Sequence, residues 1–364
     1  MALILTFLGK GGTGKTITAI AAAKKFASQG KRVLLASQDP EPVLSLLLET
    51  SLTPDPISIA DNLWAVHLQA TAQLERNWEE LKKLEAQYLR TPFFKAVYGQ
   101  ELGVLPGMDS ALALNAIREY DASNRYDVIV YDGADAQTSL RMWGIPEILD
   151  WYLRRFRDVL ADSDLAKALS PFVQPIANVI LAVNSSGDVF DQPTSQVTQL
   201  LERGREAISD PGRVLTYLVT TADPLAIATA RHLWGGAQQV GLTVGGVILN
   251  QSEGVDLSGL EFEPLPVSPI PTWEMGEWDS LIESLPDFTD SLQAPRPVTV
   301  DLTAGKVSLF LPGFSKNQVK LTQYGPELTI EAGDQRRNLF LPAELKGRQV
   351  KGAKFQDGYL VISF

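Results

Sequence analysis

The chain has 364 residues, more than one hydrophobic core usually serves, so its length predicts two domains. It is 45% hydrophobic and 21% charged, as globular proteins are, and no run approaches the roughly 20 apolar residues of a membrane span. The absence of cysteine excludes disulfides, thiolate metal sites and cysteine nucleophiles. We therefore expect a cytoplasmic protein with no direct membrane insertion and no zinc.

The net charge of −11 is unevenly distributed along the chain. From Pro295 to Phe364, ten Lys/Arg stand against six Asp/Glu, a net of +4, which leaves −15 for the rest. Binding to nucleic acid or to an anionic membrane depends on neutralising negative phosphates. The acidic main part therefore predicts no nucleic-acid partner.

Predicted strands and helices alternate over the first 250 residues. Residues 3–8 predict a buried strand, residues 17–29 a helix that ends at Gly30, and residues 33–36 a second strand. Further strands are expected at 63–68, 126–132, 178–183, 214–220 and 244–249, the last of this half, and further helices at 70–90, 111–121, 146–160 and 225–240. This order predicts an α/β fold with a doubly wound, mostly parallel sheet, plus helical insertions at about 70–122 and 141–213.

The sequence changes character after about Pro264, where prolines become frequent and the helical pattern soon ends. Short alternating runs follow, such as residues 307–311 and 359–362, bounded by turn pairs such as Pro312-Gly313. We predict a boundary near Ala294. Residues 1–294 would form the α/β domain, and residues 295–364 a small all-β sandwich.

A glycine-rich segment joins the first strand to the first helix: Gly9-Lys10-Gly11-Gly12-Thr13-Gly14-Lys15-Thr16. It fits the pattern G-x-x-x-x-G-K-[ST], whose backbone N–H groups and helix N-terminus attract phosphate. We predict that it binds ATP through Gly11, Gly12, Thr13, Gly14 and Lys15. Lys15 would bridge the β- and γ-phosphates as a catalytic residue, and the Thr16 hydroxyl would bind Mg²⁺.

Two acids follow predicted strands beside this loop. Asp39 comes after the second strand, where a carboxylate can orient the water that attacks the γ-phosphate. Asp132 ends an apolar strand and is expected to hold Mg²⁺ through a water. We therefore predict Asp39 as the catalytic acid/base and Thr16, Asp39 and Asp132 as the residues around the metal. The alternative for Asp39 is a helix cap or turn.

The second lysine of the loop, Lys10, makes it resemble the deviant P-loop of the ArsA/MinD/ParA group of dimeric ATPases. This resemblance implies that Lys10 reaches across a homodimer to the partner's nucleotide and stabilises the transferring phosphoryl group, as an arginine finger does. The alternative is a solvated lysine that only strengthens ATP binding.

Three further segments resemble the arsenite-pump and tail-anchored-protein-targeting branch of that group. Ser37-Gln38-Asp39-Pro40 resembles its switch I, and residues 132–141 resemble its switch II, with the family's Asp, Ala, Leu and Arg kept but its Thr, Pro, Gly and His replaced. Asn250 ends a strand where the family asparagine holds the adenine edge, and Pro271 belongs to a segment like the loop over the base. The alternative for Asn250 is a turn residue.

The tail resembles an α-crystallin domain, the fold of small heat-shock proteins. The resemblance rests on Leu309-Phe310-Leu311-Pro312-Gly313, on Leu339-Phe340-Leu341-Pro342 and on Ala353-x-x-x-Asp357-Gly358-x-Leu360, in that order. It implies an appended module for binding a client or docking a partner.

The predicted activity is hydrolysis of ATP by a homodimer that opens and closes around a protein client. Trp151, Leu153, Phe156 and Leu160 either line a client groove or belong to the core. One alternative is a positioning ATPase of the ParA/MinD type, which would need a basic DNA-binding face or a membrane helix. Another is a chaperone-like protein that binds nucleotide without hydrolysing it.

Overall fold

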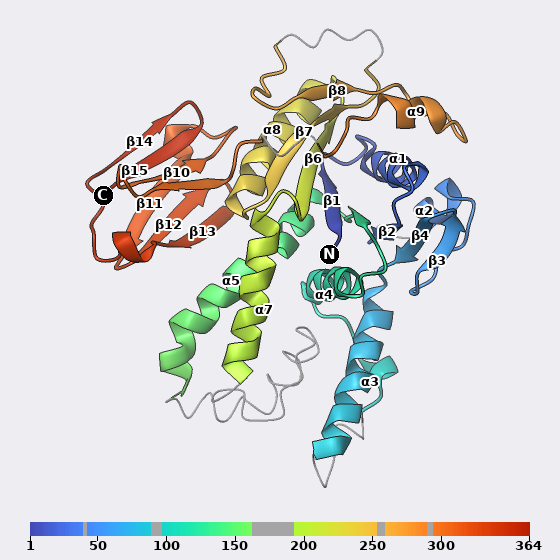
Figure 1. The fold of residues 1–364 in the computed structure, drawn as a ribbon, viewed down its shortest axis with the longest axis horizontal. Helices are drawn as coiled ribbons and strands as arrows, with labels where there is room; N and C mark the ends of the chain where they lie inside the picture. The colour runs from blue at the N-terminus through green and yellow to red at the C-terminus, as the bar shows by residue number, and fades with distance from the viewer. Residues whose placement is uncertain (39–41, 89–96, 162–192, 253–258, 290–293) are drawn as a thin grey trace.

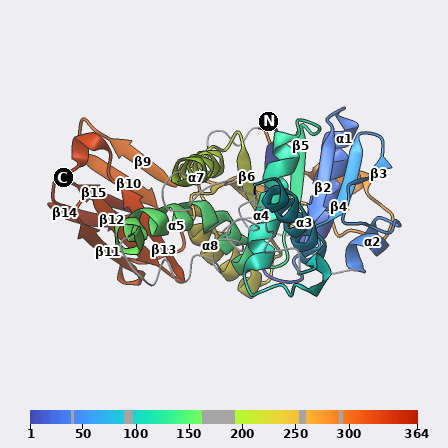
Figure 2. The same ribbon diagram turned by 90° about the horizontal axis from the view of Figure 1, so that it is seen from below.

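The computed structural model describes residues 1–38, 42–88, 97–161, 193–252, 259–289 and 294–364. A large sheet flanked by helices lies beside a smaller all-β part that ends the chain (Figure 1). Seen from below, α5 and α8 lie between these two parts (Figure 2). The predicted fold class is therefore confirmed.

The large sheet has the strand order β3-β4-β2-β5-β1-β6-β7-β8. Neighbouring strands in this sheet run parallel, except that β3 and β4 are antiparallel. The strands are β1 (Leu3–Leu8), β2 (Val33–Ser37), β3 (Ile57–Ala60), β4 (Leu63–His67), β5 (Val128–Asp132), β6 (Val214–Thr220), β7 (Thr243–Leu249) and β8 (Val267–Pro269). The central strands β2, β5, β6 and β7 are buried at every residue because helices cover both faces.

Helices form the outer layers. On one face, α1 (Lys15–Ser28) and α9 (Asp279–Ser284) share a core with the sheet, and the small side chains of Ala19 and Ala21 to Ala23 are fully buried there. The other face is covered by α4 (Met108–Ala122), α5 (Ala136–Ala161) and α8 (Pro224–Gln239). The remaining α-helices among the described residues are α2 (Val43–Leu47), α3 (Ala70–Tyr88) and α7 (Pro193–Ser209).

The C-terminal part is a sandwich of two antiparallel sheets, β14-β15-β10-β9 and β11-β12-β13. Side chains alternate between core and surface, as in β12, where Leu328 and Ile330 are buried and their neighbours are not. The strands are β9 (Val298–Asp301), β10 (Lys306–Phe310), β11 (Val319–Tyr324), β12 (Glu327–Ala332), β13 (Gln335–Phe340), β14 (Gly352–Gln356) and β15 (Tyr359–Ser363).

Some predicted bounds were wrong. The strand at 244–249 is not the last of its half, because the three residues of β8 extend the sheet. The helix expected from Pro146 begins ten residues earlier, and Pro146 lies inside it. The predicted strand at 178–183 lies outside the described residues. The domain boundary at Ala294 stays a prediction.

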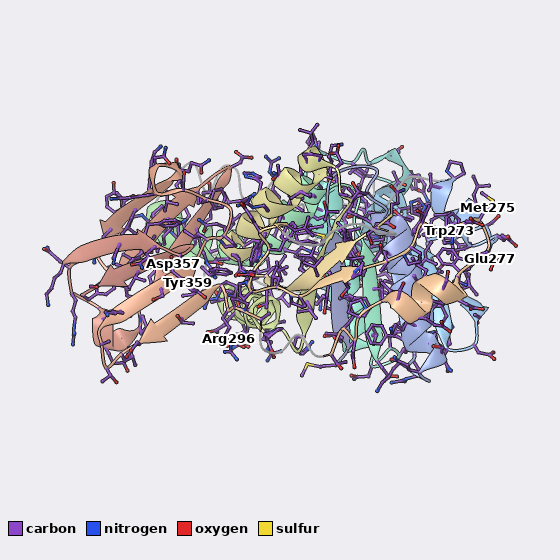
Figure 3. All side chains as sticks on the ribbon, turned by 90° about the horizontal axis from the view of Figure 1, so that it is seen from above. Trp273, Met275, Glu277, Arg296, Asp357 and Tyr359 are labelled. Carbon is purple, nitrogen blue, oxygen red and sulfur yellow. The ribbon has the colours of Figure 1, made fainter. Side chains whose placement is uncertain are left out.

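The sandwich packs directly against the α/β part. Phe310 of β10 lies in the buried cluster that α8 forms with the sheet. Its ring packs edge-on against that of Trp234, with 5.4 Å between the ring centroids. By contrast, Trp273, Met275 and Glu277 lie at the opposite end of the molecule from Asp357 and Tyr359 (Figure 3). Among the described residues, the main contacts between helices of the α/β part and strands of the sandwich involve α5 and α8.

Of two adjacent glycines in α8, Gly235 is the one that allows this approach. A Cβ on Gly235 would overlap the Phe314 ring and the Pro312 carbonyl of the sandwich, whereas a Cβ on Gly236 would meet only a terminal methyl of Leu140. Helix propensity alone favours alanine at both sites by about 1 kcal/mol.

We predict that Gly235→Ala lowers the free energy of unfolding by about 1–3 kcal/mol, since overpacking outweighs the gain in propensity. Gly236→Ala, the matched control, is expected to stay within about 1 kcal/mol of the wild type because a methyl group can move aside. Urea denaturation measures both. Equal stabilities for the two variants would contradict the close contact at Gly235.

Candidate functional site

The candidate site lies at the edge of the sheet where the central parallel strands end. In the parallel register Ser37 of β2 is the partner of Asp132 of β5, and β1 runs beside β5 into the glycine-rich loop. Ligands of doubly wound sheets bind at this carboxyl edge. The fold therefore brings the loop and the predicted acid to the same place.

The glycine-rich loop is a tight turn that caps α1. Gly12 and Gly14 have φ of 84° and 91°, the left-handed region that favours glycine. Thr13 folds back onto Lys10, since its N–H and its hydroxyl both donate to the Lys10 carbonyl, at 3.3 and 2.9 Å. A Cβ on Gly9 would overlap the Val219 carbonyl of β6. The loop thus requires glycine at several positions.

Asp132 is joined to the loop and to β2 by two hydroxyl groups. Its carboxylate accepts hydrogen bonds from Thr16 Oγ1 at 3.4 Å and from Ser37 Oγ at 3.0 Å. The Asp132 residue is only 2% exposed. A carboxylate beside a threonine hydroxyl is an oxygen set that suits Mg²⁺, so the residues fit the expected metal.

Asn250 lies against the phosphate loop. Its Nδ2 donates to the Thr13 carbonyl at 2.9 Å, its Oδ1 accepts from the Gln251 N–H at 2.9 Å, and the residue is 5% exposed. Each polar atom of the amide retains one further hydrogen-bonding position. The end of β7 is thereby fixed to the loop. Pro271, half-buried, follows Ile270, whose N–H donates to the Leu249 carbonyl of β7 at 2.9 Å.

Asp135 is a residue of this site that the sequence analysis did not select. Its Oδ1 accepts the N–H groups of Gln137 and Thr138, both at 2.9 Å, and so caps the start of α5. Partial burial raises the pKa of Asp135, but hydrogen bonds from Thr138 and Gln137 and the charge of Lys15 lower it on balance. An aspartate just before a helix is a sequence signal for such a cap. Pro146, however, predicts a later start for the helix.

The segment that leads to Asp39 is held by three contacts. The Gln38 N–H donates to the Asp132 carbonyl at 2.9 Å, and its Nε2 donates to the Asp109 carbonyl at 3.3 Å. Its Oε1 accepts from the buried Tyr131 hydroxyl, whose pKa is raised, chiefly by burial. Asp39 itself lies outside the described residues, so its role stays a prediction.

The other predicted residues are placed as follows. Lys15 is the first residue of α1, and Lys10 is exposed at the start of the loop. Of the four apolar positions proposed for a groove, Trp151 is half-buried and Leu153 is 41% exposed. The side chains of Phe156 and Leu160 lie outside the described ones. Across the ranges given above, no helix is both long and apolar enough to cross a membrane.

Comparisons with known proteins agree with this geometry. The family model described as anion-transporting ATPase matches residues 2–255, and a model for an HSP20-like domain found in ArsA matches residues 304–364. A protein of Chlorobaculum tepidum named "Putative arsenical pump-driving ATPase" is 27% identical over 99% of this chain and 95% of its own length. An "ATPase ASNA1 homolog" of Cryptosporidium parvum is 26% identical, over 67% of this chain and 63% of its own length.

Proposed function

Because the chain belongs to the anion-transporting ATPase family, we propose that it hydrolyses Mg-ATP as a nucleotide-dependent homodimer and couples this cycle to a protein client. The enzyme class, ATPase, follows from the family. The observation that carries the mechanism is the contact of Thr16 with Asp132 beside the phosphate loop. A neighbouring hydroxyl and carboxylate are the groups expected to hold Mg²⁺ in P-loop ATPases, and their contact supports the proposal.

In the proposed mechanism the loop glycines and Lys15 hold the phosphates, while Thr16 and Asp132 would hold Mg²⁺, whose charge would offset that of the phosphates. Asp39 orients the attacking water. Lys10 acts in the partner subunit's site, which its exposed position supports. The retained Gly12 and Gly14 conformations support the cradle, because only the backbone is needed to surround an anion.

Asn250 is proposed to recognise the adenine edge as well as to hold the loop. Asn250→Ala is expected to lower the preference for ATP over GTP about tenfold, since an amide pairs with one purine edge. Loss of its buried hydrogen bond is also expected to lower the free energy of unfolding by about 1–3 kcal/mol. Thr272→Ala, at an exposed neighbour of Pro271, serves as the control. If only stability falls, Asn250 holds the loop and does not select the base.

The client is proposed to bind the exposed apolar face of α5. Ile148, Tyr152 and Leu153 are 42%, 51% and 41% exposed there, more than isolated surface residues require. We expect a labelled apolar helical peptide to bind more tightly with an ATP analogue than with ADP, measured by fluorescence anisotropy. Equal affinities in the two states would contradict the coupling.

Steady-state Mg-ATP turnover and light scattering of the same sample test the proposal together. We expect turnover, and dimers that form with an ATP analogue and dissociate with ADP. Turnover by monomers would refute the dimeric mechanism, and ATP binding without turnover would favour the non-hydrolysing alternative. Binding to DNA or to lipid vesicles with ATP would favour a positioning ATPase.

A further inference from the structure

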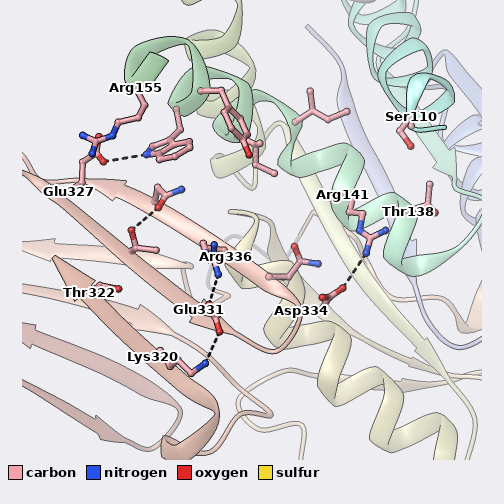
Figure 4. Close-up of a pocket in the computed structure, with 18 of the residues that line it drawn as sticks. Ser110, Thr138, Arg141, Arg155, Lys320, Thr322, Glu327, Glu331, Asp334 and Arg336 are labelled. Atoms are coloured by element: carbon pink, nitrogen blue, oxygen red, sulfur yellow. Dashed lines mark hydrogen bonds and ion pairs between the residues drawn. The ribbon is translucent and has the colours of Figure 1, made fainter. Parts of the chain in front are cut away.

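α5 runs without interruption from the candidate site to the sandwich. Its capping residue Asp135 is close enough to Lys15 of the phosphate loop for that charge to help lower the Asp135 pKa, and Glu147 lies twelve residues further on, about 18 Å along the helix. The same helix then contacts the sandwich at separate points (Figure 4). These contacts pair Arg141 with Asp334 at 3.2 Å, Trp151 Nε1 with Glu327 at 3.3 Å and the Arg154 guanidinium with the Phe340 ring at 3.7 Å.

A groove of about 1160 Å³ lies between α5 and the outer face of the β11–β13 sheet. Its lining includes Thr138 from the first turn of α5 and Tyr324 from the far end of β11. The sandwich therefore does not cover the length of α5. The few points at which the two surfaces touch therefore add to the packing of Leu140, Met142 and Trp143 of α5 in the core beside the sheet.

Arg337 of β13 makes the most buried of these contacts. Its side chain is 7% exposed, and its Nε donates to Glu147 Oε1 of α5 at 3.2 Å. Its Nη1 donates to the Gln238 carbonyl of α8 at 3.0 Å. One side chain of the sandwich thus holds two helices of the ATPase part at once. A guanidinium suits this task because its donors diverge in a fixed plane.

We propose that Arg337 is a positioning residue for ATP hydrolysis, which acts on the site by fixing α5 and hence Asp135 against the phosphate loop. The contact would affect catalysis through the position of α5. α5 continues as one helix through Pro146, so a shift at Glu147 is passed toward its N-terminus, and misplacement there by about 1 Å can cost about 100-fold in rate. The inference rests on the proposed nucleotide site.

The variant Arg337→Met, made in the full chain, tests whether Arg337 positions α5 for hydrolysis. We expect kcat to fall about tenfold while KM and the affinity for an ATP analogue stay within about twofold, because the phosphate loop is untouched. Glu147→Leu should also lower kcat, and the double variant should fall no further than Arg337→Met, since both changes remove the contact between these two side chains. Arg336→Gln is the matched control on the same strand, where Arg336 is exposed and pairs with Glu331 inside the sandwich; its kcat should not change.

A folded Arg337→Met protein with the kcat of the wild type would overturn the proposal, as would an equal loss in Arg336→Gln. If Arg337→Met does not fold, Arg337→Lys replaces it, because lysine keeps the charge but lacks the two diverging donors. Hydrogen exchange of the wild type then provides a second readout. We expect amides of β13 to exchange more slowly with a bound ATP analogue, and unchanged exchange would overturn the idea. A wild type without turnover would instead refute the proposed function.

Discussion

Replacement of Asp132 by asparagine is expected to lower Mg-ATP turnover at least about 100-fold while the protein stays folded. The carboxylate accepts from the hydroxyl of Thr16 and from that of Ser37, and an amide of the same shape can accept from one of them and donate to the other. What the amide lacks is the negative charge that holds Mg²⁺. Metal assistance contributes several kcal/mol to phosphoryl transfer, and about 2.7 kcal/mol corresponds to 100-fold.

Asp127→Asn is the matched control for this experiment. Asp127 precedes the same strand at its other end and pairs with Arg32 at 2.7 Å, away from the site. Turnover by Asp127→Asn should stay within about twofold of that of the wild type. Asp132→Asn with more than about a tenth of the wild-type turnover would contradict the metal-holding role.

The control variant Asp127→Asn should also change how the stability of the fold depends on pH. Hydrogen bonds from the side chain and backbone of Arg32 lower the pKa of Asp127 to about 2. A carboxyl with a lowered folded-state pKa stabilises the fold above its unfolded-state pKa, and this contribution is lost as the pH falls toward 2. Acid unfolding between about pH 4 and 2 should therefore be less steep in Asp127→Asn.

Lys10→Ala is expected to lower turnover by about 1000-fold, the lower range for an arginine finger, while ATP binding weakens far less. The Lys10 carbonyl is held by Thr13, but its side chain is exposed at the edge of the loop. In the proposed dimer, a cation in that position would reach the nucleotide bound to the other subunit. Lys31→Ala, at an exposed lysine beyond the far end of α1, serves as the control.

The alternative for Lys10 predicts a different pattern. A lysine that only strengthens ATP binding in its own subunit would raise KM and leave kcat unchanged when removed. A normal kcat at saturating ATP in Lys10→Ala would therefore refute the role in the partner's site.

The parts predicted well from the sequence are those that nearby residues encode. The glycine spacing around Lys15 defines the loop because each left-handed position needs a glycine. The strand that ends at Asp132 is fixed by a run of buried apolar residues. Alternation of apolar and polar residues in the tail predicts the two-sheet sandwich, because in a sheet with one buried face every second side chain points into the core.

The parts that were missed depend on distant partners or on a competing local signal. Asn250 contacts Thr13, 237 positions away, which no local pattern reveals. Pro146 resembles a first-turn proline and concealed the true start of α5 at the Asp135 cap. The contact of Arg337 with Glu147 joins the sandwich to α5 and follows only from how these two parts pack.

A mixture of Lys10→Ala and Asp132→Asn subunits provides the most direct test of the shared site. Each variant alone should be inactive. In a mixed dimer, the Lys10→Ala subunit keeps its own Asp132 and receives Lys10 from its partner, so one of two sites is complete. An equal mixture, refolded together, should recover about a quarter of the wild-type turnover per subunit, since half the dimers are mixed. No recovery, with mixed dimers shown by two affinity tags, would contradict hydrolysis across the dimer.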